Sequence, residues 1–258
     1  MEGSLSVLQR HPGLSVAAFS LVFRAVHKLL RALPLPKGVC RDEFRVWKWR
    51  NLSVSLVHSM LTGPWAVTCV LLSPEMLDNM YSSYTPLSYL LICTSTGYFV
   101  QDAGDIILTG HARGSWEFLL HHALVIWCFL YTLFTRHYVA GAVVALFVEV
   151  NSVFLHTRLL LKLAGAQSSR LYGLNRLINL FTYVLFRLSA QAYLTWYILR
   201  NYSWLDHAGY FLSSMMLMNI MILVYFYRLL RADFLPRGKG HLAHNGMQHG
   251  SSKKFLSD

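Results

Sequence analysis

The residues of this chain that could do chemistry are polar side chains placed inside long apolar stretches. The strongest candidates are the adjacent histidines His121 and His122, together with Asp102. Histidine is neutral near pH 7 and can accept a proton, so one of the pair could act as a general base or transient acyl acceptor. Asp102 or Glu117 would then tune its basicity. The alternative is structural, because polar side chains also form hydrogen bonds between membrane helices.

The other polar residues in these stretches have structural alternatives as well. We expect His58 and His156 to form hydrogen bonds between helices, and Asp105 to lie close enough to a helix end to reach water. Glu149 and Arg187 would form a buried ion pair. The candidate catalytic residues are therefore His121, His122, Asp102 and Glu149, and the candidate lipid-binding residues are His58, Asp105, Glu117, His156 and Arg187.

The depth of these residues in a membrane follows from the rise of an α-helix, about 1.5 Å per residue. Counted from the ends of the apolar stretches, the histidine pair, Asp102, His58 and His156 lie about 7–9 Å below the cytosolic boundary. Glu149 and Arg187 come from opposite directions and reach about 18–20 Å, near the midplane. The sequence therefore predicts one polar layer in the cytosolic half, with an ion pair below it.

The histidines cannot both have the same orientation. Adjacent residues of a helix differ by about 100° around its axis, so only one of them can point straight into a central space. Its neighbour would face another helix. Glu117 lies four residues before His121 on the same face and could orient it.

The elements that must position these residues are membrane helices. The chain has 258 residues, of which 55% are hydrophobic and 14% are charged, whereas a soluble domain carries about 25% charged residues. This composition argues against a disordered chain and an ordinary soluble enzyme. A spanning helix needs about 20 mostly apolar residues. Seven stretches qualify: 12–30, 52–72, 87–108, 116–135, 138–161, 174–199 and 207–230. They predict an all-α, multi-pass transmembrane helical bundle of six to seven spans.

The charges between the stretches predict their orientation. Basic residues concentrate in the loop 31–50 and in the tail, and alternate loops are rich and poor in Lys and Arg, so the rich loops are expected in the cytosol. The net charge of +11 suits anionic lipid head groups better than nucleic acid. The first stretch is short enough to be a cleaved signal peptide, but a retained helix keeps the basic loop inside. We expect an N-terminal membrane helix or signal peptide at 1–31, a membrane domain at 32–235 and a disordered cytosolic tail at 236–258.

The cysteines predict neither a disulfide framework nor a metal site. There are four of them, with no CxxC pair. Fewer than three or four converging ligands also argues against structural zinc. No resident cofactor is expected.

Several segments, in order along the chain, resemble the TLC domain, a family that includes ceramide synthases and the translocation-associated TRAM proteins. The segments are WRNLSVSLVHS, GYFVQDAGDI, SWEFLLHHALV, LFVEVNSVFLHTRLLL and LFRLSAQAYLTWYILR. The resemblance covers about residues 30 to 235. Within the family it is closest to the small plasma-membrane subgroup of types 1 and 2, and FRLSAQAYLT and KKFLSD favour type 1.

The resemblance implies a helical bundle around a membrane-embedded cavity. In ceramide synthases a histidine pair in that cavity, matched here by His121 and His122, serves transfer of a fatty acyl group from acyl-CoA to a sphingoid amine. The synthases then carry an Asp-x-x-Asp motif. This chain has Glu149, Val150, Asn151 and Ser152 there, so the second acid is missing. That difference argues against ceramide synthesis.

The subgroup resemblance implies a function in membrane composition. These proteins are associated with phospholipid homeostasis and plasma-membrane fluidity, and with limiting the incorporation of long-chain polyunsaturated acyl chains. We therefore expect a plasma-membrane protein that binds a phospholipid or acyl-CoA, with the endoplasmic reticulum as the alternative location. One alternative function is an acyl-CoA-dependent acyltransferase. Another is a non-catalytic modulator of a membrane-protein partner such as a channel.

Overall fold

The computed structural model of the chain describes residues 9–40 and 42–233, and every regular element within them is helical. This confirms the predicted all-α class; the predicted tail at 236–258 lies outside the described residues. In chain order the helices are α2 (Pro12–Arg31), α3 (Glu43–Leu72), α4 (Glu75–Asp78), α5 (Pro86–Leu108), α6 (Trp116–Thr135), α7 (Val139–Ala145), α8 (Val148–Leu163), α9 (Arg170–Thr182), η1 (Tyr183–Leu188), α10 (Ser189–Arg200) and α11 (Ala208–Asp233).

Capping side chains determine where two of the central helices begin. The Asp42 side chain accepts a hydrogen bond of 2.9 Å from the backbone N–H of Arg45, so α3 begins at Glu43. At α5, Thr85 and Ser88 form a reciprocal capping box. The helix thus begins nine residues before the apolar stretch that starts at residue 52.

Two of the predicted stretches are interrupted. The stretch 138–161 is divided into α7 and α8, with a break at residues 146 and 147. The stretch 174–199 runs through α9 and α10 with the six-residue π-helix η1 between them. A π-helical turn holds more residues than an α-helical turn, so it changes the direction of the side chains that follow it.

Among the described residues, five helical stretches are long and apolar enough to cross a membrane. They are Pro12–Arg31, Glu43–Leu72, Trp116–Thr135, Val139–Leu163 and Ala208–Asp233. The multi-pass architecture is therefore confirmed. The helices α5 and α9–η1–α10 are outside this group, and the count of seven spans stays a prediction.

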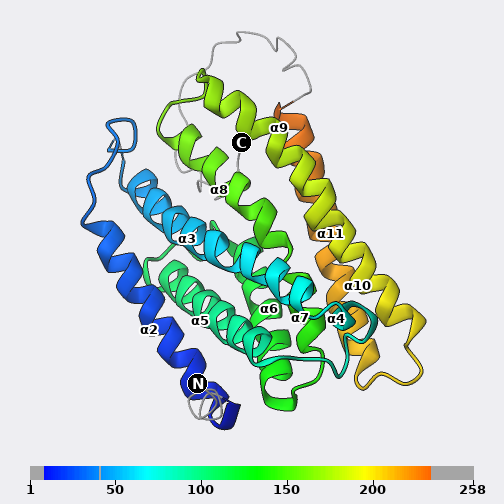
Figure 1. Ribbon diagram of the computed structural model, residues 1–258. Coiled ribbons are helices and arrows are strands. Elements are labelled where there is room, and N and C mark those ends of the chain that lie inside the picture. The colour runs from blue at the N-terminus through cyan, green and yellow to red at the C-terminus, as the bar shows by residue number, and fades with distance from the viewer. Residues whose placement is uncertain (1–8, 41, 234–258) are drawn as a thin grey trace.

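Close approaches between backbones hold the bundle together. The helices α2, α3 and α5 lie side by side, and α8 crosses next to α3 (Figure 1). A Cβ atom at Gly97 of α5 would lie 2.6 Å from the Cβ atom of Phe19 on α2, and one at Gly63 of α3 would lie 2.9 Å from the backbone nitrogen of Val150 on α8. Only glycine permits these approaches. The second one brings Glu149 against α3.

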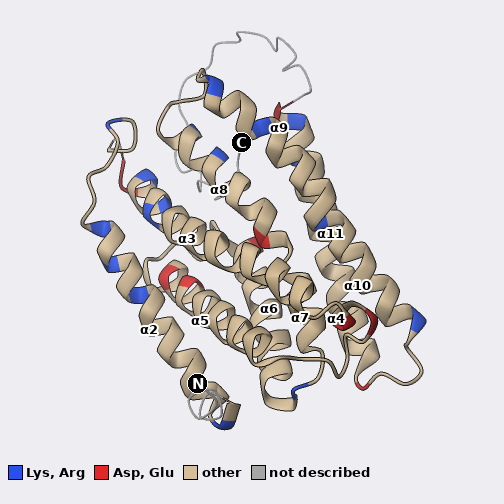
Figure 2. Cartoon of the chain, viewed as in Figure 1, with Lys and Arg blue, Asp and Glu red and all other residues tan. Residues whose placement is uncertain are grey.

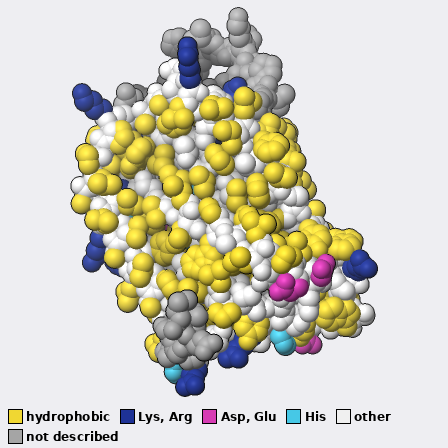
Figure 3. All heavy atoms as spheres, viewed as in Figure 1, with side chains coloured by type: hydrophobic (Ala, Val, Ile, Leu, Met, Phe, Trp, Pro, Cys, Tyr) yellow, Lys and Arg dark blue, Asp and Glu magenta, His cyan; other side chains and the backbone are white. Residues whose placement is uncertain are grey.

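The surface agrees with a protein embedded in lipid. Hydrophobic side chains cover most of the face in Figure 3, and charged side chains lie toward its two ends. Lys and Arg gather at the end of the bundle where α3 begins and where α9 lies (Figure 2). This is the end that the sequence predicts to be cytosolic.

Candidate functional site

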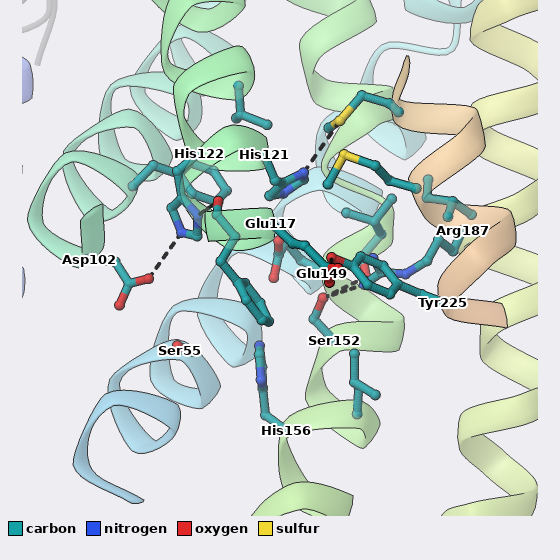
Figure 4. A pocket seen from close by; sticks show the side chains of 18 of the residues that line it. Ser55, Asp102, Glu117, His121, His122, Glu149, Ser152, His156, Arg187 and Tyr225 are labelled. Atoms are coloured by element: carbon teal, nitrogen blue, oxygen red, sulfur yellow. Dashed lines mark hydrogen bonds and ion pairs between the residues drawn. The ribbon is translucent and has the colours of Figure 1, made fainter. Parts of the chain in front are cut away.

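A cavity of about 1120 Å³ lies inside the bundle. Most of its walls come from α3, α5, α6, α8, η1 and α11, and α7 and α10 each contribute one residue. Figure 4 shows the polar side chains that face it. Of the predicted site residues, those that line the cavity are Asp102, Glu117, His121, His122, Glu149, His156 and Arg187.

His122 joins three helices at one side of this cavity. Its Nε2 atom lies 3.0 Å from Oδ2 of Asp102 on α5, and its Nδ1 atom lies 2.6 Å from the carbonyl oxygen of Phe118. Asn51 of α3 donates a hydrogen bond of 2.6 Å to the other oxygen of Asp102. The predicted proximity of Asp102 to the histidine pair is therefore confirmed. Both ring nitrogens face acceptor oxygens, so the His122 ring is engaged with the protein on both sides.

His121 points in a different direction. Its ring is perpendicular to that of His122, with an interplanar angle of 89°. Its Nδ1 atom lies 3.4 Å from the sulfur of Met218 on α11. A thioether sulfur is only a weak acceptor, so this contact suits an Nδ1–H donor and leaves Nε2 as the unprotonated nitrogen. His121 is thus the member of the pair that could accept a proton in the cavity.

Glu149 is bound to α3. Its Oε2 atom accepts a hydrogen bond of 2.6 Å from the hydroxyl of Ser59 and lies 3.7 Å from Nδ1 of His58. His58 is 1% exposed and stacks on Tyr98, with ring centroids 3.9 Å apart. Tyr98 lines the cavity, whereas His58 lies behind it. Glu149 and His58 are therefore neighbours, not members of two separate layers.

Arg187 does not pair with Glu149, and the predicted ion pair was wrong. The guanidinium of Arg187 donates from Nε to Oδ1 of Asn151 at 3.0 Å and from Nη2 to Oγ of Ser152 at 2.8 Å. Depth alone suggested the pair. The π-helical turn at Arg187 and the break before α8 instead determine the directions of the side chains, so the two charges have different partners.

Glu117 does not orient His121, which corrects a second prediction. Its carboxylate forms an ion pair with Arg228 of α11 at 3.0 Å and accepts a hydrogen bond of 3.3 Å from the Tyr225 hydroxyl. The pair joins α6 to α11 at the rim of the cavity. A full positive charge on the adjacent helix is a better partner for a carboxylate than a neutral imidazole one turn away.

The two remaining predicted residues differ in position. Asp105 lies outside this cavity, lines a second pocket and is 9% exposed, so its expected contact with water stays a prediction. It accepts a hydrogen bond of 3.1 Å from the Trp47 indole and lies 3.4 Å from His27 of α2. His156 lines the cavity, and its buried Nδ1 atom has no hydrogen-bond partner among the described residues.

A polar stripe on α3 was not predicted from the sequence. Asn51, Ser55 and Ser59 recur every four residues and so share one helix face. Asn51 holds Asp102, the Tyr98 hydroxyl donates to Ser55 at 2.8 Å, and Ser59 holds Glu149. Their regular spacing in an apolar stretch was the signal that could have identified them.

Comparisons with known proteins agree on one family. A family model described as the TLC domain matches residues 48–231. TLC domain-containing protein 1 from Homo sapiens is 41% identical over 227 residues, which cover 88% of this chain and 92% of that protein. The Rattus norvegicus protein of the same name is 44% identical over 217 residues, covering 84% and 88%. TLC domain-containing protein 2 from Danio rerio is 40% identical over 229 residues, covering 88% and 90%.

Proposed function

This chain belongs to the TLC domain family, and we propose that it regulates the acyl composition of membrane phospholipids by holding a lipid in its cavity. The observation that carries the proposal is the cavity itself. Its volume of about 1120 Å³ is above the range of about 300–1,000 Å³ for small-molecule pockets. It lies among membrane-spanning helices, which favours a ligand that comes from the bilayer.

The lining of the cavity is suited to an amphiphile. Met215, Met218 and Met221 of α11 supply an apolar wall, and methionine adapts to chains of different shape. The same cavity is lined by Arg187 and by His121, whose Nδ1 atom contacts the sulfur of Met218. A lipid could therefore place its chain against the methionines and its polar group near these residues.

Binding without turnover is favoured over chemistry by the state of the histidine pair. His122 already contacts Asp102 and the Phe118 carbonyl, so it connects helices and is not a free base. The resemblance to the plasma-membrane subgroup supports the finer parts of the proposal. These are a location in the plasma membrane and a limit on the incorporation of polyunsaturated acyl chains, which sets fluidity.

The test is a lipidomic profile of cells that lack the protein and are rescued with variants, after feeding with a polyunsaturated fatty acid. Leu155→Trp places a large side chain at the cavity wall and should abolish rescue. Leu223→Trp is the matched control, because Leu223 is 58% exposed outside the cavity. His121→Ala should weaken rescue only partially. Full rescue by correctly localised Leu155→Trp would exclude a function of the cavity.

A second function, acyl transfer from acyl-CoA, is favoured by the free nitrogen of His121. In that case His121 would take the proton of the attacking lipid hydroxyl or amine as that group bonds to the acyl carbon, a contribution of about 10²–10⁴-fold in rate. The thioester carbon–sulfur bond would break, and the proton would pass to the departing coenzyme A thiolate. Purified protein with labelled acyl-CoA should then form a labelled lipid, and His121→Ala should abolish the product. Full rescue of cells by a His121→Ala, His122→Ala double variant would favour the third candidate, a modulator of a membrane-protein partner such as a channel.

A further inference from the structure

We infer that Arg187 is the binding site for the acidic group of an anionic lipid, either a carboxylate or a phosphate. The inference rests on the proposed function, because it identifies which class of lipid the cavity holds. It starts from the position of Arg187 on the π-helix η1. Such turns inside α-helices occur frequently at functional sites. The segment is anchored to α11, since the Tyr183 hydroxyl donates a hydrogen bond of 2.8 Å to the Ile222 carbonyl.

The immediate surroundings hold the guanidinium in one orientation. Its Nε atom donates to the Asn151 side-chain oxygen. The amide nitrogen of Asn151 in turn donates to the Asn179 backbone carbonyl at 3.0 Å and to the Thr182 hydroxyl at 3.1 Å. These donations fix the amide so that its oxygen must face Arg187. The arginine fork is therefore ordered in the absence of a ligand.

The partners of Arg187 are all neutral. They are the Asn151 amide, the Ser152 hydroxyl and the Val148 carbonyl, which lies 3.4 Å from Nη2. The guanidinium carbon also lies 5.3 Å from the centroid of the Tyr183 ring, a cation–π contact. The third nitrogen, Nη1, has no hydrogen-bond partner among the described residues, and Arg187 is only partly buried. Part of the guanidinium thus remains accessible from the cavity that it lines.

Each acidic residue of the cavity is already engaged elsewhere. Glu149 is held by Ser59, Asp102 contacts His122, and Glu117 pairs with Arg228. Of the described arginines in the lining, Arg158 pairs with Asp233. Arg187 forms no ion pair with any described residue, although an unpaired charge is costly in a membrane interior.

An anionic ligand would compensate this charge. Arginine presents parallel N–H donors that match both carboxylate and phosphate groups. The methionine wall of α11 is within the same cavity, so a single chain could extend from the acidic group along it. The chemistry at Arg187 therefore selects a free fatty acid or a phospholipid, whereas an uncharged ester of the same chain would lack the contact.

The test compares three probes with one acyl chain. Full-length protein purified in a neutral maltoside detergent is titrated with oleate, oleoyl lysophosphatidate and methyl oleate, and bound probe is measured by mass spectrometry. We expect at least one acidic probe to bind about tenfold or more tightly than methyl oleate. The tighter of the two identifies the head group. Arg187→Gln should reduce that preference to near unity, and Arg187→Lys should retain part of it.

A second pair of variants separates charge from folding. Ser152→Asp would place a carboxylate beside Arg187 and should abolish the preference for acidic probes while arginine is kept. Ser152→Asn introduces a side chain of nearly the same size as aspartate but without a charge. The difference in acidic-probe preference between the two variants therefore measures the effect of the charge. Thermal unfolding of each variant identifies any loss of fold.

The outcomes distinguish this inference from the proposed function. Equal binding of oleate, oleoyl lysophosphatidate and methyl oleate would overturn the role of Arg187 but leave a lipid-holding cavity. An acidic preference that survives in folded Arg187→Gln, or in Ser152→Asp, would overturn it as well. If no probe binds the wild-type protein, the proposed function fails and the inference fails with it.

Discussion

The close contact at Gly97 allows a test of whether α2 is a permanent part of the bundle. A Cβ atom at this position of α5 would lie 2.6 Å from the Phe19 Cβ atom and 2.8 Å from the backbone nitrogen of Ser20. One of these neighbours is backbone, so α2 would have to shift as a whole. If α2 is instead removed as a signal peptide, nothing at Gly97 resists a side chain from that direction.

The expected size of the effect follows from two opposing terms. Replacing glycine by alanine inside a helix stabilises it by about 0.5–1 kcal/mol. Overpacking a filled interface costs about 1–3 kcal/mol. For Gly97→Ala the cost of the clash should exceed the gain in helix propensity, so the free energy of unfolding should fall by about 1–2 kcal/mol. For a domain of this size, each kcal/mol corresponds to a fall of about 2–4 °C in the melting temperature.

The matched control is Gly104→Ala on the same helix. A Cβ atom at Gly104 meets no other atom within 4 Å, so only the gain in helix propensity remains. The two variants should therefore change the melting temperature of the purified protein in opposite directions. Equal stability of Gly97→Ala and Gly104→Ala would refute the packing argument. A mature protein whose mass lacks residues 1–31 would do the same.

Three further predictions concern the membrane topology, the hydrogen bond between Tyr81 and Asp206, and the buried carboxylate of Glu149. Epitope tags at Cys40 and at the C-terminus should both need permeabilisation for labelling, because both segments are basic; labelling of the Cys40 tag on intact cells would favour a cleaved first stretch. The hydrogen bond to Asp206 raises the pKa of Tyr81 to about 12. The hydrogen bond therefore stabilises the folded protein fully below about pH 10, the ordinary tyrosine pKa, and this stabilisation is lost as the pH rises through 12. Tyr81→Phe should remove this part of the pH dependence of thermal stability, and an unchanged profile would contradict the assignment. Ser59→Ala and Glu149→Gln should be coupled by about 1.5–3 kcal/mol in a double-mutant cycle of unfolding, whereas additive losses would show that the contact contributes nothing.

The parts of the site that could be predicted from the sequence lie on uninterrupted helices. The stretch 116–135 coincides with α6, and α5 begins one residue before the predicted 87–108. On such helices the depth and direction of a side chain follow from its residue number. The proximity of Asp102 to His122 was therefore predictable.

The directions of Glu149 and Arg187 were not predictable in this way. Glu149 follows a break at residues 146 and 147, and Arg187 lies within a π-helix. Neither irregularity has a proline or another strong signal in the sequence. One extra residue in a turn rotates later side chains by about 100°. Two residues at one depth can then face different helices, as these two do.

The missing second acid of the ceramide synthase motif changes the charge beside Arg187. Glu149 keeps the first acidic position, but its carboxylate is held by Ser59 on α3. The second position is Ser152, and its hydroxyl accepts a hydrogen bond from Arg187. An aspartate at that position would place a negative charge against the guanidinium, whereas serine leaves the positive charge without an acidic partner. The positive charge that serine leaves at Arg187 can stabilise a bound anion but cannot accept a proton, so activation of a nucleophile in this cavity would depend on the unprotonated Nε2 atom of His121.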